Sequence, residues 1–262
     1  MTSFSPSGTG EWLGYQVDRA DLDALLMARA RELGVVVLQP SRALDVRFEV
    51  GLAAVSTDQG AVTARYVIDA SGQASWIGRK LGLDHEIASP PLRVRYGYCT
   101  LPETWTDRWP HLSGDTTGWW WSARISPTRL AWARLTWSKS QLAKPDPIAD
   151  LLDDGPALGA DVTWKRLPMP AGHHYFVCGD AAAVLDPTSS HGVLKAVMSG
   201  MMAAYQANAV FVGLSPHEGA VRYARWVEAW WEKDVAHLNA LYRQLGTEWN
   251  LPPRSVSPSL II

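Results

Sequence analysis

The stretch YFVCGDAAAVLDPTSSHGVLKAVMSG, residues 175–200, constrains the fold of this chain more than any other part of its sequence. An apolar run stops at Gly179 and Asp180, a loop containing proline and glycine follows, and a run of small and apolar residues begins near Gly192. This order predicts a buried strand, a turn and a helix. A strand that ends in glycine lets the backbone approach a ligand closely, and the Asp180 carboxylate can accept hydrogen bonds from sugar hydroxyls.

The loop after this strand has two interpretations that the residues alone leave open. It runs from Pro187 to Gly192, and the helix behind it offers free N–H groups and a positive dipole end that favour an anionic ligand. Alternatively, the segment is an ordinary strand–loop–helix connection that Asp180 or Asp186 caps.

The composition excludes several classes of protein. The chain has 262 residues, 47% of them hydrophobic and 19% charged, which suits one large domain or two modest ones and argues against disorder. A formal net charge of -2 gives no electrostatic basis for binding nucleic acid or an anionic membrane. The two cysteines, Cys99 and Cys178, cannot form a disulfide framework, so we expect a reducing, cytoplasmic setting.

Neither a secretory signal nor a membrane span is expected. The first residues, MTSFSPSGTGEWLG, contain neither a basic segment nor an apolar one. The longest apolar stretch, 192–213, is interrupted by Lys195, Gln206 and Asn208, so we expect a buried helix there and not a membrane-spanning one.

The first third of the chain predicts a mixed α/β arrangement. Leucine spacing over 17–33 predicts an amphipathic helix that Asp18 caps and Gly34 ends. The further elements expected are a strand over 35–39, strands over 43–70 that turn at 57–60, and a helix over 74–82.

From about residue 91 onward, large apolar and polar residues alternate, which predicts an antiparallel sheet with two distinct faces. Trp119 and Trp121 fall on one face, where they either stack on an aromatic substrate or pack in the core. A short helical insertion is expected over 145–162. Residues 215–246 predict one long helix or two, which Ser215 caps.

Three motifs occur in an order that resembles a known superfamily. Arg19 lies in the pattern V-x-R-x-x-L-D-x-x-L, and the residues from Asp69 to Gly72 form a D-[AGS]-[ST]-G turn. The third motif is the G-D pair with its D-P-x-x-x-x-G loop, described above. From about Gly14 to Trp231 the chain resembles the FAD-dependent monooxygenases and tryptophan halogenases, whose flavin domain has the p-hydroxybenzoate-hydroxylase type of fold.

The resemblance implies a mixed α/β flavoprotein monooxygenase fold with FAD as cofactor. The residues that it implies at the flavin are Arg19, Asp69, Gly72, Gly179, Asp180, Asp186, Pro187 and Gly192. The domains that it implies are a partial FAD-binding domain over 1–90, an antiparallel substrate-binding sheet over 91–170, the G-D motif and helix of the FAD-binding domain over 171–213, and a C-terminal helical segment and tail over 214–262.

Within the superfamily, the loop D-P-T-S-S-H-G and the segment RYARWVEAWWEKD look most like halogenase-like flavoproteins, including enzymes that hydroxylate a tryptophan. The stretch GWWWSARIS is similar to the halogenase motif W-x-W-x-I-P but has Ala123 and Arg124 where Ile-Pro would stand. We therefore favour hydroxylation or another flavin oxidation over halogenation. The implied partners are an aromatic small molecule or a tryptophan-containing substrate, with NAD(P)H or a flavin reductase as electron donor.

One motif of the superfamily is missing from this sequence. Its members open with a strand, a G-x-G-x-x-G turn and a helix that holds the FAD pyrophosphate, whereas PSGTGEWLG here has no strand before it and no helix after it. We therefore expect an N-terminally truncated fold with poor FAD affinity. Either the start is assigned too late, or the chain is a fragment, or another polypeptide supplies the unit. The alternative function is an interaction module: a non-catalytic flavoprotein remnant or one subunit of a split flavoenzyme.

The sequence identifies no catalytic residue but offers two candidates. His191, in the loop, either donates to flavin or substrate or makes a local turn contact. Lys195, one turn into the helix, either stabilises flavin charge or is solvated or paired. His173 and His174 have no carboxylate or cysteine partners at ligand spacing, so no metal site is expected.

Overall fold

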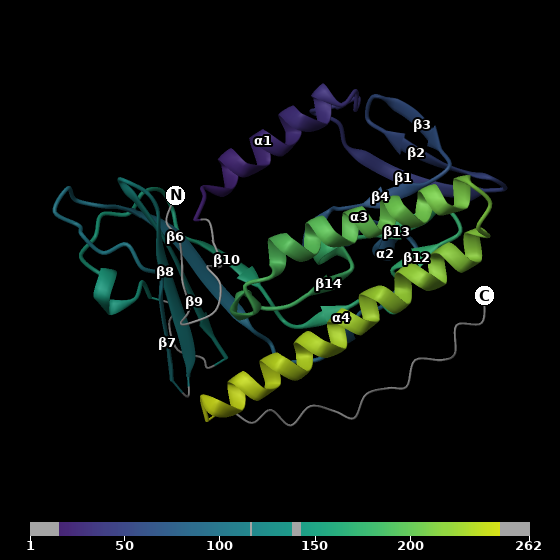
Figure 1. Cartoon of the computed structure of the whole chain (residues 1–262). Helices are drawn as coiled ribbons and strands as arrows, with labels where there is room; N and C mark the ends of the chain where they lie inside the picture. Colours follow the sequence, from purple (N-terminus) through teal and green to yellow (C-terminus); the bar gives the residue numbers. More distant parts are fainter. Residues whose placement is uncertain (1–15, 116, 138–142, 247–262) are drawn as a thin grey trace, which may run out of the picture. The chain divides into compact units, whose positions relative to one another are not determined.

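The computed structural model describes residues 16–115, 117–137 and 143–246, and its chain divides into two compact units (Figure 1). The first unit comprises residues 1–39 and 92–161, and the second comprises 40–91 and 162–262. Each unit is described by itself.

The first unit begins with α1, Arg19–Glu32. The Asp18 carboxylate accepts a hydrogen bond from the Ala20 N–H at 2.9 Å, and Gly34 leaves the helix at a φ of 85°, as the sequence predicted. The strand expected over 35–39 is wrong, since these residues form no regular structure. A β-branched run needs a partner strand to become a strand, and Val36 is instead 81% exposed.

The antiparallel sheet expected after residue 91 is confirmed. Five strands lie in the order β10, β6, β9, β8, β7. Their bounds are Leu158–Asp161, Arg93–Thr100, Arg129–Thr136, Gly118–Ser126 and His111–Asp115. The helical insertion predicted over 145–162 is mostly wrong. These residues form a single 3-10 turn, η2 (Asp146–Ile148), and then the strand β10.

Within its described residues, the second unit contains three small sheets. The first is the meander β1 (Ala43–Glu49), β2 (Leu52–Thr57) and β3 (Gly60–Ala64), which turns where the sequence predicted. The second places β13 (Tyr175–Val177) between β12 (Ala171–Gly172) and β4 (Val67–Asp69). The third joins β14 (Ala183–Val184), β11 (Lys165–Arg166) and β5 (Glu86–Ile87). A 3-10 turn, η1 (Gly72–Ala74), and the short helix α2 (Trp76–Lys80) follow β4.

Two long helices complete the second unit: α3 (Gly192–Phe211) and α4 (Pro216–Gln244). The C-terminal segment is therefore one helix, and the Ser215 hydroxyl caps it by accepting from the Glu218 N–H at 3.1 Å. In Figure 1 the two helices run side by side past β12 and β13. Tyr223 of α4 joins this packing, because its ring lies 5.1 Å from that of Phe176 and its hydroxyl donates to the Val177 carbonyl at 2.8 Å.

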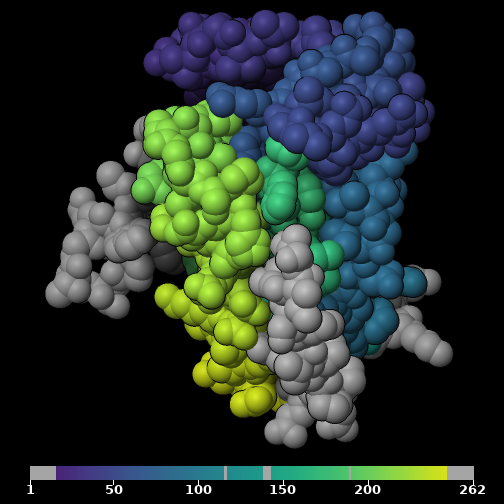
Figure 2. Space-filling model, turned by 90° about the vertical axis from the view of Figure 1, so that its right-hand side faces the viewer, coloured from purple at the N-terminus to yellow at the C-terminus, as the bar shows by residue number. Residues whose placement is uncertain are grey.

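The expectation that 192–213 forms a buried helix is wrong for one side of α3. Its buried residues are Ser199, Ala203, Gln206 and Ala207. The exposed face of α3 consists of Val193, Leu194, Val197, Met198, Met201, Tyr205 and Phe211. Figure 2 shows the green-to-yellow surface of α3 and α4 open to the viewer. Among the described residues, none of the helices combines the length and apolar character that a bilayer span requires.

Replacing Tyr223 with phenylalanine tests the contact that fixes α4 to β13. The Tyr223→Phe variant leaves the buried Val177 carbonyl without its donor, so we expect a loss of about 1–2 kcal/mol in the free energy of unfolding. Urea titration followed by circular dichroism measures it. Tyr205→Phe on the exposed face of α3 is the matched control and should change stability little; an equal loss in both variants would contradict the assignment.

Candidate functional site

Two turns of the second unit meet at the carboxyl ends of neighbouring parallel strands. β4 pairs in parallel with β13, with Asp69 opposite Val177. The Cys178 N–H donates to the Asp69 carbonyl at 2.9 Å, so the chain leaves both strands at the same edge of the sheet. The carboxyl edge of parallel strands is where ligands bind in α/β proteins. The turns after Asp69 and after Cys178 therefore form the candidate site.

The Asp69 carboxylate holds the first turn in place. One oxygen accepts from the Ser71 N–H at 2.9 Å and the other from the Ile77 N–H at 2.7 Å. The residue is only 5% exposed, and Gly72 within the turn has a φ of 63°, a conformation that glycine adopts without strain. The Asp69 carboxylate thus binds N–H groups of the protein backbone. It would contribute to a ligand site by fixing the shape of the turn.

Gly179 brings the second turn against α3. Its φ is 58°, and a Cβ added to it would lie 3.3 Å from the Cβ of Ala196. Its N–H donates to the Ser199 hydroxyl at 2.9 Å, and that hydroxyl donates to the Ala196 carbonyl at 3.1 Å. The next residue, Asp180, is exposed in the 3-10 turn η3, Gly179–Ala181. No pattern in the sequence pointed to Ser199, because a serine within an apolar helix is uninformative without its partner.

Asp186 is completely buried and anchors the loop that follows. It caps the 3-10 turn η4, Pro187–Ser189, by accepting from the Thr188 N–H at 2.8 Å, and it accepts from the Trp164 indole N–H at 2.6 Å. The Thr188 hydroxyl in turn lies 3.1 Å from the Tyr242 hydroxyl of α4. Burial raises the pKa of Asp186, and the hydrogen bonds from Thr188 and Trp164 oppose that shift. Asp186 therefore caps η4 within the connection, whereas His191 at the N-cap position of α3 makes no side-chain capping hydrogen bond.

The two candidate catalytic residues lie at the start of α3. The Lys195 ammonium contacts the Asp234 carboxylate of α4 and lies 4.0 Å from the centroid of the Trp230 ring, so it joins the two helices. His191 immediately precedes the helix. Its pKa is lowered mainly by partial burial, and to a smaller extent by the nearby cationic groups of Lys195, His237 and Lys233. A catalytic role for either residue stays a prediction.

The other implied FAD residues contribute less to this edge. Arg19 forms an exposed ion pair with Asp23 at 2.8 Å in the first unit, and its role at a flavin stays a prediction. Pro187 occupies the first position of η4, and Gly192 opens α3 with no atom within 4 Å of an added Cβ. Within the described part of the chain, no group of three histidine, cysteine or acidic side chains is placed to hold a metal ion.

The first unit offers an aromatic surface on its five-stranded sheet. The register places Trp119 opposite Leu135 and Trp121 opposite Ala133, on the same face. Trp119 is 4% exposed and packs in the core, whereas Trp121 is half-buried beside the small Ala133. Tyr96, opposite Ala133 on β6, is exposed on the same face. Trp121 and Tyr96 are thus the aromatic side chains of this face that a ligand could reach.

Several of the solved structures with this fold are flavin-dependent halogenases. The myxobacterial chondrochloren halogenase CndH aligns with a TM-score of 0.74 and 22% identity, over 87% of this chain and 60% of that chain. The flavin-dependent halogenase CmlS aligns with a TM-score of 0.70 and 20% identity, over 83% of this chain and 44% of that chain. The flavin-dependent brominase Bmp2 aligns with a TM-score of 0.71 and 20% identity, over 80% of this chain and 60% of that chain.

No protein-family model matches the sequence, and no curated protein matches it. The chain has the mixed helix-and-sheet fold of the FAD-dependent halogenase-like flavoproteins, as the resemblance implied. A flavoprotein/dehydrogenase from Cytophaga hutchinsonii shares it, with a TM-score of 0.65 and 19% identity over 88% of this chain and 60% of that chain. The chain spans 44% to 60% of the length of these solved proteins.

Alanine at Gly179 tests the close approach between this turn and α3. Both Gly179→Ala and the control Gly82→Ala place a side chain at a φ near 60°, which costs about 1 kcal/mol, but only position 179 also meets Ala196. We therefore expect Gly179→Ala to lower the free energy of unfolding by about 1–3 kcal/mol more than Gly82→Ala. Equal losses in urea titrations would show that the contact with α3 is unimportant.

Asparagine at Asp186 tests the burial of its carboxyl group. An acid with a raised folded-state pKa binds more protons folded than unfolded, so stability falls as pH rises from its ordinary value of 3.8 through the raised value. Asp186→Asn removes this contribution. The difference in unfolding free energy, wild type minus Asp186→Asn, should therefore decrease across this range in urea titrations. A constant difference would contradict the raised pKa.

Proposed function

We propose that this chain is the cofactor-binding and substrate-binding part of an FAD-dependent oxidoreductase of the halogenase-like type. One observation carries the proposal: the turns after Asp69 and Cys178 lie together at the carboxyl edge of two parallel strands, directly before the loop that opens α3. The fold shared with solved flavin-dependent enzymes supports it.

The residues at this edge fit an FAD molecule. Gly179 has no side chain where one would press on α3, so the turn lies close to the first residues of that helix. The loop anchored by Asp186 leads into Gly192, where the first N–H groups of α3 carry a partial positive charge that suits an electron-rich ring. Asp180 is exposed next to Gly179, and its carboxylate is of the type that accepts hydrogen bonds from ribityl hydroxyls.

In the proposed mechanism, the chain orients the cofactor and the substrate. When bound, FAD would supply the redox chemistry, with a donor as the source of electrons and oxygen as their acceptor. Asp186, through Thr188 and Trp164, holds the loop before α3 in one conformation. Trp121 and Tyr96 offer stacking surface to an aromatic or tryptophan-containing substrate in the first unit.

Oxidation by hydroxylation is favoured over halogenation. Arg124, which stands in the W-x-W-x-I-P-like stretch where the halogenase motif has proline, donates to the carbonyls of Ser126 and Pro127 at 3.0 and 2.8 Å. This arginine therefore closes the β8–β9 turn, and the segment serves a structural purpose of its own. The electron donor of the proposed enzyme is NAD(P)H or a flavin reductase.

A second candidate function, an interaction module or one subunit of a split flavoenzyme, is favoured by a different observation. β4 is an edge strand of its sheet, with Ile68 exposed, and α3 carries the exposed face described above. An open strand edge and an apolar helix surface are features of protein–protein contacts.

Titration of FAD tests the proposed function. Flavin absorbance and fluorescence should show binding to the wild-type chain, with the titration extended to about 1 mM to capture weak affinity. Gly179→Ala should weaken binding about tenfold or more, because the added methyl group alters the turn at the ligand, whereas Gly82→Ala should not. Folded protein that shows no FAD binding would reject the enzymatic proposal and favour the interaction module.

A further inference from the structure

Three arginines share one face of the five-stranded sheet in the first unit. Arg93 and Arg95 lie two residues apart on β6, so their side chains leave the sheet on the same side. Arg134 of β9 lies directly opposite Arg95 in the antiparallel register, so it belongs to the same side. We call this side the arginine face; Trp121 and Tyr96 lie on the other side of the sheet.

The arginine face is accessible to a partner. Arg93 and Arg95 are exposed, and Arg134 is half-buried. Gly159 of β10 lies opposite Arg95, so this neighbouring strand adds no side chain at that position. Within the described part of the chain, the guanidinium groups of Arg93 and Arg134 make no hydrogen bond and no ion pair. Two of the three cations are therefore available to a ligand.

The pairing of Arg95 with Arg134 places two like charges directly opposite each other. Such a pair destabilises an antiparallel sheet, so the fold alone gives no reason for it. Among the described side chains of the cross-strand rows that contain Arg93 and Arg95, the acid is Asp161 of β10, opposite Arg93. The arginine face is thus locally positive in a chain whose formal net charge is -2. A local charge of this sign favours a partner of complementary charge.

An aromatic side chain continues the row on the far side of Arg134. Trp120 of β8 lies opposite Arg134 and is half-buried. Its ring stacks with the ring of His111 of β7, at a distance of 6.5 Å between ring centroids, and His111 in turn contacts the Asp107 carboxylate. Tryptophan and arginine are among the residue types that contribute most to the energy of protein–protein interfaces. The row from Arg95 through Arg134 to Trp120 therefore has the composition of a protein-binding surface.

An acidic peptide in extended conformation matches the spacing of these cations. A guanidinium binds a carboxylate through two parallel hydrogen bonds. Alternate side chains of an extended peptide lie about 7 Å apart on one side, and the same repeat separates Arg93 from Arg95 on β6. Acidic side chains at alternate positions can thus reach both arginines at once, with Arg134 as a third cation across the row.

Single-stranded nucleic acid is the less suitable partner. It also offers anions and flat rings, but its affinity rises with the number of phosphates that the protein neutralises. Three arginines in a chain with a formal net charge of -2 neutralise few phosphates. A peptide segment with a few carboxylates needs no more cations than this face supplies.

We propose that the arginine face is a docking surface for an acidic segment of a partner protein, bound in extended conformation. The alternate acidic side chains of the segment pair with Arg93 and Arg95, and Arg134 adds a contact from the neighbouring strand. This surface lies on the side of the sheet that Trp121 and Tyr96 do not occupy, so the proposal goes beyond the proposed function and does not depend on FAD.

Fluorescence anisotropy tests this surface with a short fluorescein-labelled peptide in which glutamate alternates with threonine. We expect the peptide to bind the wild-type chain. Arg93→Gln and Arg134→Gln should each weaken binding about tenfold, because each removes a charge-assisted contact. Circular dichroism should show both variants folded. The thermal midpoint of Arg134→Gln should be no lower than that of the wild type, since the substitution removes a like-charge pair; a markedly lower midpoint would make Arg134 a structural residue and overturn its place in this surface.

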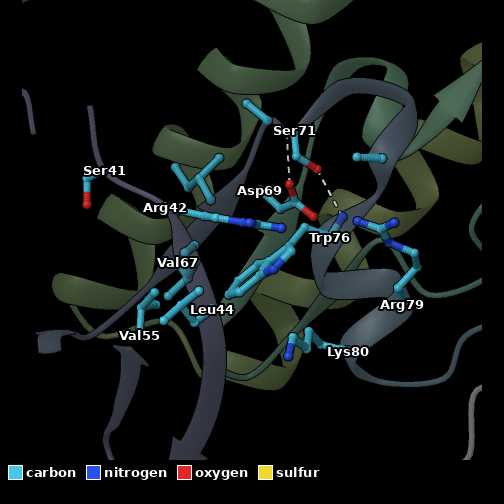
Figure 3. A pocket seen from close by; sticks show the side chains of 14 residues that line it. Ser41, Arg42, Leu44, Val55, Val67, Asp69, Ser71, Trp76, Arg79 and Lys80 are labelled. Atoms are coloured by element: carbon cyan, nitrogen blue, oxygen red, sulfur yellow. Dashed lines mark hydrogen bonds between the residues drawn. The ribbon is translucent and has the colours of Figure 1, made fainter. Parts of the chain in front are cut away.

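Arg42→Gln is the matched control. Arg42 is exposed, as Arg93 is, but it belongs to the second unit. There it lines a cavity of about 810 Å³ together with Trp76 and Arg79 (Figure 3), so this cavity is an alternative place for an anionic peptide to bind. Arg42→Gln should leave the peptide affinity unchanged. A loss as large as that in Arg134→Gln would overturn the assignment to the arginine face.

Two further probes define the chemistry of the partner. A peptide with lysine in place of every glutamate should not bind the wild-type chain, and a labelled oligothymidylate should bind more weakly than the acidic peptide. Folded protein that does not bind the acidic peptide, or that binds the lysine peptide equally well, would overturn the proposal. So would tighter binding of the oligothymidylate that Arg134→Gln weakens, since the surface would then serve nucleic acid.

Discussion

The parallel pairing of β4 with β13 is the constraint on which the second unit depends. These strands are distant in sequence, yet their pairing brings the Asp69 and Gly179 turns to one edge, where the Cys178 N–H joins them. A different contact then holds each turn in place. In the first turn the buried Asp69 carboxylate accepts a backbone N–H, and in the second the Gly179 N–H donates to the Ser199 hydroxyl of α3. The edge is organised by hydrogen bonds that the protein makes with itself, which leaves its outward surface for a ligand.

Local signals in the sequence predicted local structure well. Asp18 and Ser215 cap helices because a side-chain oxygen needs only an N–H two or three residues away. The hairpins and the antiparallel sheet follow from alternation that is written directly into their strands. The prediction of a strand over 35–39 failed because a β-branched run indicates strand propensity, whereas a strand also needs a partner strand to pair with. For α3, apolar composition indicated burial on every side, and composition carries no information about what covers each side.

The candidate site was predictable only in part, for a related reason. The G-D pair and the D-A-S-G turn are contiguous motifs, so the sequence revealed them. Arg42 lines one cavity with Trp76 and Arg79 only after the meander and α2 have folded around β4, and no spacing rule links Arg42 to the other two. Trp164 is likewise distant from Asp186 in the sequence, so the hydrogen bond between its indole N–H and the Asp186 carboxylate is seen only in the structure. The sequence thus located the turns and missed the side chains that surround them.

The contact between Thr188 and Tyr242 ties the loop before α3 to the last turns of α4. Helix ends fray and are the places where proteases begin to trim a chain. Digestion that removes α4 back past Tyr242 would free the loop from its distant anchor while sparing every residue of the strand edge. The far carboxyl region of α4 therefore helps to hold the loop that leads into α3.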